Sequence, residues 1–209
     1  QPATIKGRKI SANKMVLLEL LAELDNPNAD AVSLEAIALN DPSLTYKILK
    51  VVNSAAFNTP KKIVSLSHAI SLLGVKQIKR WVIIFMTAGN PSVSGDLVNS
   101  MLIRARMCEL LSEIAEQQDP ISYFMMGLLS QLDALLDIEM SELLAQMPLT
   151  DEITTAILNH QGKMGEILND VKCFQRGDFK SIRGNIGDAF YKMAYRHSIK
   201  WAEQVMKAI

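Results

Sequence analysis

The sequence predicts an all-α fold, a compact bundle of several helices. Hydrophobic residues make up 49% of the 209 positions but aromatic residues only 6%, and Leu, Ile, Ala and Met, which dominate the apolar set, favour helix over sheet. Apolar residues also recur three and four positions apart along most of the chain, the spacing that places side chains on one face of a helix. No segment shows the alternation expected of a strand, and a chain of this length can bury one sizeable core.

Charge and composition argue against several classes of protein. Lys and Arg total 22, and Asp and Glu also total 22, so the chain as a whole has no general attraction for polyanions. The longest apolar run, 81–86, is far below the roughly 20 residues needed to cross a bilayer, and the first residues do not resemble an export signal. Cys108 and Cys173 form no CxxC pair and are expected to be buried free thiols. We expect a cytoplasmic protein that needs no cofactor.

The most informative stretch is 41–57. Asp41 is a good helix cap, and Pro42 suits the first helical position, so a helix is predicted to start here. Its apolar stripe ends at Asn53 and Ser54, two polar residues in an apolar setting. Because buried polar groups need partners, both are expected to bond backbone groups where this helix meets its neighbour.

Two helices are predicted before this stretch. Residues 1–9 are polar and basic and are interpreted as a linker from a preceding domain, so that the folded domain spans 10–209. The apolar spacing predicts a first amphipathic helix over 13–24. Ser33 is expected to cap the second helix.

The helices that follow the stretch are also bounded by turn and cap signals. Ser65 or Ser67 is predicted to cap a short helix that ends at Gly74, and the next helix spans 75–88. Lys76, Lys79 and Arg80 are placed on its outer face beside Trp81 and are candidates for binding a partner. The alternative is a solvated face with the Trp81 ring in the core.

The second half of the chain continues the helical pattern. A long helix is expected over about 96–117, and Asp119-Pro120 repeats the helix-opening device of Asp41-Pro42. The next helix, 120–137, is apolar nearly all round and is therefore predicted to lie deepest. Thr150 is expected to cap a later helix.

The last helices are predicted from the same spacing. One runs to His160, one covers about 164–176, and a terminal helix begins near Asn185. The predicted inner face of the terminal helix consists of Ile186, Phe190, Met193, His197, Trp201 and Val205.

Several of these pieces together resemble the signature of the HDOD family, the HD-related output domain of bacterial signalling proteins. They are Asp41-Pro42-Ser43-Leu44, Val52-Asn53-Ser54-Ala55, Ser67-His68-Ala69-Ile70 and Leu73-Gly74. The resemblance implies structural roles for Asp41, Pro42, Asn53, Ser54, Ala69 and Gly74. The segments 160–162 and 174–178 are similar to a subset in which this domain follows an EAL domain, the cyclic di-GMP phosphodiesterase module, and residues 1–9 would then be the junction.

The resemblance also implies that the metal site of the parent HD superfamily is missing. In related sequences an adjacent His-Asp pair follows a Gly-Leu-Leu run, whereas here Ser130-Gln131 follow it; a His-His doublet is replaced by His160-Gln161, and the expected ligand helix, 101–106, contains no histidine. We therefore expect no metal, no catalytic residue and no enzyme activity. A carboxylate cluster of Asp133, Asp137 and Glu139 remains an alternative.

The resulting hypothesis is a non-catalytic regulatory and protein-interaction module, the output half of an EAL-HDOD protein linked to cyclic di-GMP. Its expected partners are proteins of unknown identity and the upstream EAL domain, and a homodimer is left open. One alternative is nucleic-acid binding through a local patch formed by Lys61, Lys62, Lys76, Lys79 and Arg80. Another is residual metal-dependent phosphohydrolase activity involving His160.

Overall fold

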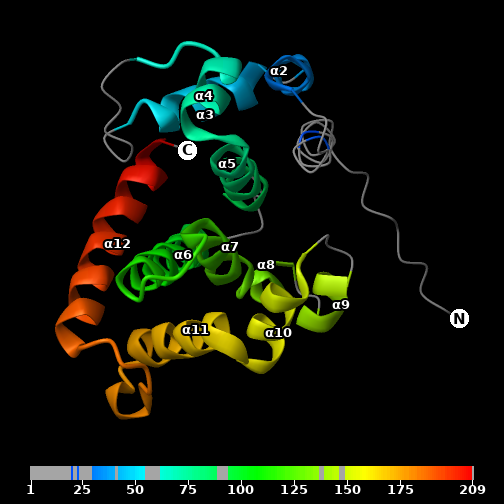
Figure 1. The fold of residues 1–209 in the computed structure, drawn as a ribbon. Coiled ribbons are helices and arrows are strands. Elements are labelled where there is room, and N and C mark those ends of the chain that lie inside the picture. The colour runs from blue at the N-terminus through cyan, green and yellow to red at the C-terminus, as the bar shows by residue number, and fades with distance from the viewer. Residues whose placement is uncertain are drawn as a thin grey trace, which may run out of the picture. The chain divides into compact units, whose positions relative to one another are not determined.

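The described part of the structure, a computed structural model, is helical, which confirms the predicted all-α class (Figure 1). It comprises residues 20, 23, 30–40, 42–54, 62–88, 94–136, 139–145 and 149–208, and these residues contain no strand. None of the helices in these ranges combines the length and apolar character needed to cross a membrane. The chain divides into two compact units, Gln1–Gly89 and Asn90–Ile209, and each is described by itself.

The first unit is built from four described helices. They are α2 (Ala31–Ala38), α3 (Pro42–Val52), α4 (Leu66–Leu73) and α5 (Val75–Ala88). Helix α4 contacts the other three, and α3 also contacts α2 and α5. Fully buried apolar side chains from all four helices form the core of this unit, among them Leu34, Ile48, Val51, Val52, Leu66 and Ile78.

Of two helix caps predicted in this unit, one is confirmed and the other is wrong. Oγ of Ser65 accepts from the N–H of His68 at 3.1 Å, which confirms Ser65 as the cap of α4. The prediction that Ser33 caps the second helix is wrong. Asp30 caps it, because Oδ1 of Asp30 accepts from the N–H of Ser33 at 2.7 Å and the helix begins at Ala31. The carboxylate of Asp30, three positions before Ser33, accepts from a free backbone N–H of the first helical turn, which is what a helix cap must do.

Asn53 joins the end of α3 to the segment that leads into α4. Its Nδ2 donates to the carbonyl of Leu49 at 2.7 Å and to that of Ile63 at 2.8 Å. Its Oδ1 accepts from the N–H of Ile63 at 2.7 Å. The predicted role of Asn53 at a helix junction is therefore confirmed. Ser54, beside it, is half-buried.

The other signature residues of the first unit have structural positions too. Pro42 is the first residue of α3, while Asp41 lies outside the described residues. Ala69 is fully buried. Gly74 ends α4 with φ +82°, and its N–H donates to the carbonyl of Ile70 at 2.8 Å. The predicted helix stop is confirmed, because this φ favours a residue without a Cβ.

Replacing Asn53 by Leu should lower the free energy of unfolding by about 2 kcal/mol, because the two backbone groups of Ile63 lose their partner. Urea unfolding followed by circular dichroism measures this change. The matched control is Asn40→Leu, at an exposed position of the same unit, which should change stability by less than about 0.5 kcal/mol. Equal losses in the two variants would contradict the junction role.

The second unit contains the remaining helices. They are α6 (Gly95–Ile114), α7 (Pro120–Leu129), α8 (Leu132–Leu136), α9 (Met140–Ala145), α10 (Asp151–Asn159), α11 (Gly162–Gln175), the short 3₁₀ turn η1 (Phe179–Ser181) and α12 (Asp188–Ala208). Helix α6 contacts α7, α11 and α12. The predicted burial of the helix after Pro120 is confirmed, since residues 123–129 are all buried. The helix ends at Leu129, however, and not near 137.

Two cap predictions of this unit have different outcomes. Oγ1 of Thr150 accepts from the N–H of Ile153 at 3.4 Å, so Thr150 caps α10 as predicted. Helix α7 does begin at Pro120, but the proposal that Asp119 repeats the helix-opening device is wrong. Asp119 has φ +55°, and its carboxylate accepts from the hydroxyl of Ser122 at 2.9 Å instead of from a backbone N–H.

The predicted inner face of the terminal helix is wrong in its first half. Phe190 and Met193 are 46% and 48% exposed, and His197 is exposed too. Trp201 and Val205 are buried as predicted. The buried face continues through Tyr191, Ala194, Ser198 and Ala202. Three of these residues have small side chains, which allow α12 to pack closely against α6. A prediction based on large apolar residues does not include them.

Candidate functional site

The polar residues at the expected metal-ligand positions lie in the second unit, at the ends of α7 and α10. Ser130 ends α7, and its hydroxyl donates to the carbonyl of Gly127 at 2.8 Å. Nε2 of Gln131 donates to the hydroxyl of Ser100 at 3.4 Å. His160 is the C-terminal cap of α10, and Gln161 is the residue before α11. Both Ser130 and Gln131 are half-buried and are held by neighbouring protein groups.

Arg104, on α6, connects the end of α7 to the end of α11. Its Nε donates to Oε1 of Gln175 at 2.8 Å, and its Nη1 donates to the hydroxyl of Ser130 at 3.3 Å. The side chain is half-buried. Burial is the main cause that lowers the pKa of Arg104, and the positive charge of Arg176 lowers it further. The guanidinium nevertheless remains charged at neutral pH.

Lys172, on α11, lies against His160. Nζ of Lys172 is 2.9 Å from Nε2 of His160. A charged ammonium can only donate, so Nε2 accepts and the imidazole proton is assigned to Nδ1. Burial lowers the pKa of both groups. The positive charges of Lys172 and Arg176 lower the pKa of His160 further. Those of Arg104 and Arg176 do the same for Lys172. The imidazole is therefore favoured in its neutral form.

Arg104, Lys172 and Arg176 are called the basic cluster below. Lys172 and Arg176 are four residues apart and so share one side of α11 as it continues into its cap. The carboxylate whose charge acts on Arg104 and Lys172 is that of Asp133, which is exposed. The cluster carries more positive than negative charge, because Arg176 disfavours the charge of Arg104 and Lys172, Arg104 disfavours that of Lys172, and, among the described residues, only Asp133 opposes them with a carboxylate.

This donor set is a poor match for a divalent metal. Carboxylates, thiolates and neutral imidazoles are the usual ligands, whereas a guanidinium and an ammonium repel a cation. The acceptor nitrogen of His160 already faces Lys172. Among the residues that the structure describes, no three His, Cys, Asp or Glu side chains are grouped as a metal site would require. Of the alternative carboxylate cluster, Asp133 and Glu139 are exposed, and Asp137 lies outside the described residues.

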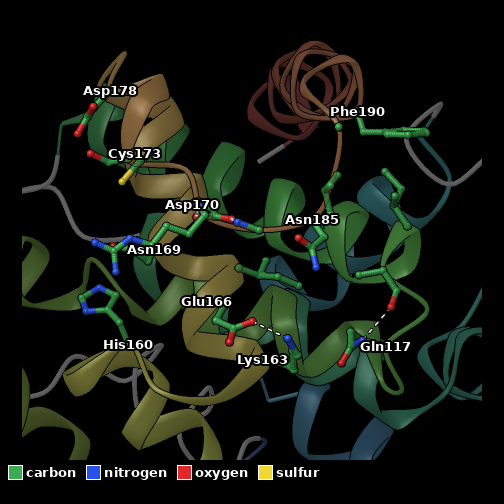
Figure 2. Close-up of a pocket in the computed structure, with 18 residues that line it drawn as sticks. Gln117, His160, Lys163, Glu166, Asn169, Asp170, Cys173, Asp178, Asn185 and Phe190 are labelled. Carbon is green, nitrogen blue, oxygen red and sulfur yellow. Dashed lines mark hydrogen bonds and ion pairs between the residues drawn. The ribbon is translucent and has the colours of Figure 1, made fainter.

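An open pocket of about 1150 Å³ lies beside α11 (Figure 2). His160, Lys163, Glu166 and Asp170 are among the residues that line it, together with the loop between η1 and α12. Nζ of Lys163 and Oε2 of Glu166 form an ion pair at 2.7 Å. Both of these side chains are exposed, so this pair is a surface contact of small energetic weight.

The buried carboxylate of the pocket, Asp170, holds the loop in place. Oδ1 accepts from the N–H of Arg183 at 3.0 Å, and Oδ2 accepts from the N–H of Gly184 at 2.9 Å and from the hydroxyl of Tyr191 at 2.7 Å. Burial and the bond to Asp170 raise the pKa of Tyr191, which keeps the phenol protonated as a donor. With three donors bound, Asp170 acts as a structural group.

The predicted partner-binding residues differ in exposure. Lys76 is exposed and Lys79 is half-exposed. The placement of Arg80 on the outer face is wrong, because Arg80 is only 3% exposed. Its guanidinium lies 5.9 Å from the centre of the Trp81 ring, and its Nη1 donates to Gln77 at 3.4 Å. The ring of Trp81 is fully buried.

Burial of Arg80 also weakens the proposed nucleic-acid patch, since a phosphate contact needs an accessible cation. Lys62 is exposed, and Lys61 lies outside the described residues.

Sequence reasoning missed both the basic cluster and Asp170. Both residues stand out in the sequence: Arg104 interrupts, with Arg106, the apolar run 101–108 on α6, and Asp170 falls among the apolar positions of α11. Neither pattern identifies the hydrogen-bond partners, because these are distant in sequence. Gln175 lies 71 residues from Arg104, and the partners of Asp170 lie 13 to 21 residues from it. The free thiols were predicted correctly, since Cys108 and Cys173 are both buried and unbridged, and burial raises the pKa of Cys108 to about 12.

Comparisons with known proteins agree with this architecture. The chain is 31% identical over 216 residues to the Bacillus subtilis protein YuxH, an alignment that covers 100% of this chain and 53% of YuxH. It is 28% identical over 187 residues to CdgJ of Vibrio cholerae, which is named a cyclic di-GMP phosphodiesterase, with 87% of this chain and 43% of CdgJ covered. The chain thus spans about half the length of these relatives.

Solved structures share the fold at low identity. A protein from Shewanella amazonensis has a TM-score of 0.61 at 19% identity, with 92% of this chain and 88% of that chain covered. An HDOD domain protein of unknown function from Geobacter sulfurreducens has a TM-score of 0.58 at 16% identity, covering 90% and 82%. The family model of the HDOD domain matches residues 11–150, two thirds of the sequence. On this match, the chain belongs to the HDOD family.

Proposed function

We propose that this chain is a non-catalytic regulatory and protein-interaction module of bacterial signal transduction. The observation that carries the non-catalytic part is the basic cluster. Arg104 bonds Ser130, which stands where the resemblance places the metal-binding pair of the parent HD superfamily, and Lys172 bonds His160. Hydrolysis by a bound hydroxide would require a divalent ion beside these charges, and their repulsion opposes its binding.

The link to cyclic di-GMP rests on a relative and on the sequence motifs. CdgJ is named a cyclic di-GMP phosphodiesterase, and this chain aligns with 43% of its length. A module that hydrolyses nothing itself would act by binding partners differently in two states of a longer protein, because a ligand shifts an equilibrium only through differential affinity. We therefore propose an upstream EAL domain as the source of the signal and a protein partner as its target.

The non-catalytic part is tested with the purified chain, Mn²⁺ and bis(p-nitrophenyl) phosphate. We expect hydrolysis at the rate of the protein-free blank and no stoichiometric metal by elemental analysis. About one equivalent of metal together with turnover, both lost in His160→Gln, would overturn the proposal. The matched control is His197→Gln, because His197 is exposed on α12.

The regulatory part is tested by partner capture with the full-length protein, with and without cyclic di-GMP. The expected result is a captured set that changes with the nucleotide, and an unchanged set contradicts coupling between the domains. Lys76→Glu with Lys79→Glu tests the candidate surface on α5, and Lys62→Glu, also at an exposed site of the first unit, is the control. If capture and output are both unaltered by the double charge reversal, this face has no role.

A further inference from the structure

The basic cluster has donors that the protein does not use. Lys172 has three N–H donors, and among the described residues its ammonium contacts Nε2 of His160 at 2.9 Å. Arg104 has five donors, of which Nε and Nη1 contact Gln175 and Ser130. Arg176 is exposed at the end of α11. Donors from two helices therefore remain available to an additional group.

The cluster also lacks local charge compensation. No carboxylate among the described residues forms an ion pair within 4.0 Å of Arg104, Lys172 or Arg176; ion pairs elsewhere in this unit include Arg106–Glu109 and Lys163–Glu166. Asp133 acts on Arg104 and Lys172 only through its more distant charge. Half-buried cations that lack an anionic partner are costly, and an external anion would reduce that cost.

The chemistry of the cluster selects among anions. Three cations and the single carboxylate of Asp133 leave an excess of two positive charges, with His160 neutral. A dianion would neutralise this excess. Planar guanidinium groups and an ammonium are the donors that proteins use for phosphoryl oxygens.

We propose that Arg104, Lys172 and Arg176 form a binding site for the dianionic phosphoryl group of a small molecule. The site is independent of the proposed regulatory function, because it requires neither an upstream domain nor a protein partner. Lys172 contributes its remaining N–H groups, Arg104 its remaining Nη donors, and Arg176, exposed at the end of α11, the third positive charge. Binding replaces repulsion among the three cations by attraction to a shared anion.

Isothermal titration calorimetry of the 209-residue chain with two probes, inorganic phosphate and guanosine monophosphate, tests the site. Saturable binding of at least one probe is expected at low salt, weakening as salt rises. Tighter binding of the nucleotide would identify a phosphate ester as the source, and equal binding would identify free phosphate. Absence of saturable binding by both probes overturns the proposal.

Variants locate the binding. Lys172→Gln and Arg176→Gln should each weaken affinity by about tenfold or more, the effect of losing one charge-assisted contact. Arg176 is exposed, so its replacement leaves the fold intact and the experiment interpretable. Lys163→Gln is the matched control, because Lys163 lies on the same helix and pairs with Glu166. Equal affinity in all three variants and the unmodified chain would rule out this site.

Nuclear magnetic resonance supplies a second measurement, since the chain has only three histidines. Burial and, after it, the positive charge of Lys172 and Arg176 lower the pKa of His160; a bound anion offsets that charge, so this pKa should rise on addition of the probe. An unchanged His160 titration at saturating probe would place the anion elsewhere and contradict the proposal.

Discussion

Replacing Asp170 by Ala should lower the free energy of unfolding by about 3 kcal/mol, the largest loss expected from a single hydrogen-bonding residue of the second unit. The carboxylate is 2% exposed and accepts three hydrogen bonds of 2.7 to 3.0 Å. Without it, the buried hydroxyl of Tyr191 and the N–H groups of Arg183 and Gly184 lose a charged acceptor. The loop between η1 and α12 would then be released from α11, and amide hydrogen exchange in this loop should accelerate.

Two variants separate the hydrogen bonds from general effects of truncation. Tyr191→Phe removes one of the three bonds and should cost about 1 kcal/mol. Asp178→Ala, at an exposed position that also lines the pocket, should change stability by less than about 0.5 kcal/mol. If Asp170→Ala were no more harmful than Asp178→Ala in chemical unfolding, the anchoring role would be wrong.

The features that sequence predicted well depend on local rules. Helix type follows from apolar spacing, and the caps Ser65 and Thr150 and the stop at Gly74 follow from the needs of the adjacent backbone. Asn53 was interpreted correctly because an amide among buried apolar neighbours must find backbone partners, and Ile63 is only ten residues away.

The features that sequence did not predict depend on contacts between distant segments. The buried face of α12 is decided by how closely small residues approach α6, and this leaves Phe190 and Met193 exposed. Gly127 was noted only as part of a Gly-Leu-Leu run. In the structure, a Cβ at Gly127 would lie 2.8 Å from the Cα of Ala105, so the glycine is needed where α7 packs on α6.

The candidate site was only half predicted for the same reason. A resemblance identified the positions Ser130, Gln131, His160 and Gln161. It implies that metal ligands of the parent HD superfamily are replaced there. The groups now present, Arg104 and Lys172, come from α6 and α11, and only the folded arrangement of these helices brings them to Ser130 and His160.

Replacing Gly165 by Ala should destabilise the chain by about 3 kcal/mol or prevent folding of the second unit. A Cβ at Gly165 would lie 2.2 Å from the carbonyl carbon of His160, 2.6 Å from its oxygen and 2.8 Å from its Cα. All three are backbone atoms at the junction of α10 and α11, where His160 and Gly162 both have positive φ. The junction cannot yield without moving one helix, so the overpacking cost exceeds the roughly 1 kcal/mol that Ala gains over Gly in a helix.

The control is Gly95→Ala, in the first turn of α6, where the nearest atom to a new Cβ is the terminal methyl carbon of Met206 at 3.8 Å. This ordinary contact predicts neutral or slightly increased stability. Thermal and urea unfolding of both variants give the comparison, and the Lys172–His160 contact supplies an independent readout. A Gly165→Ala chain that still folds must displace His160 from Lys172, and the titration of His160 should shift toward its usual range. Unchanged stability together with an unchanged His160 titration would show that the junction of α10 and α11 is less tightly packed than these distances require.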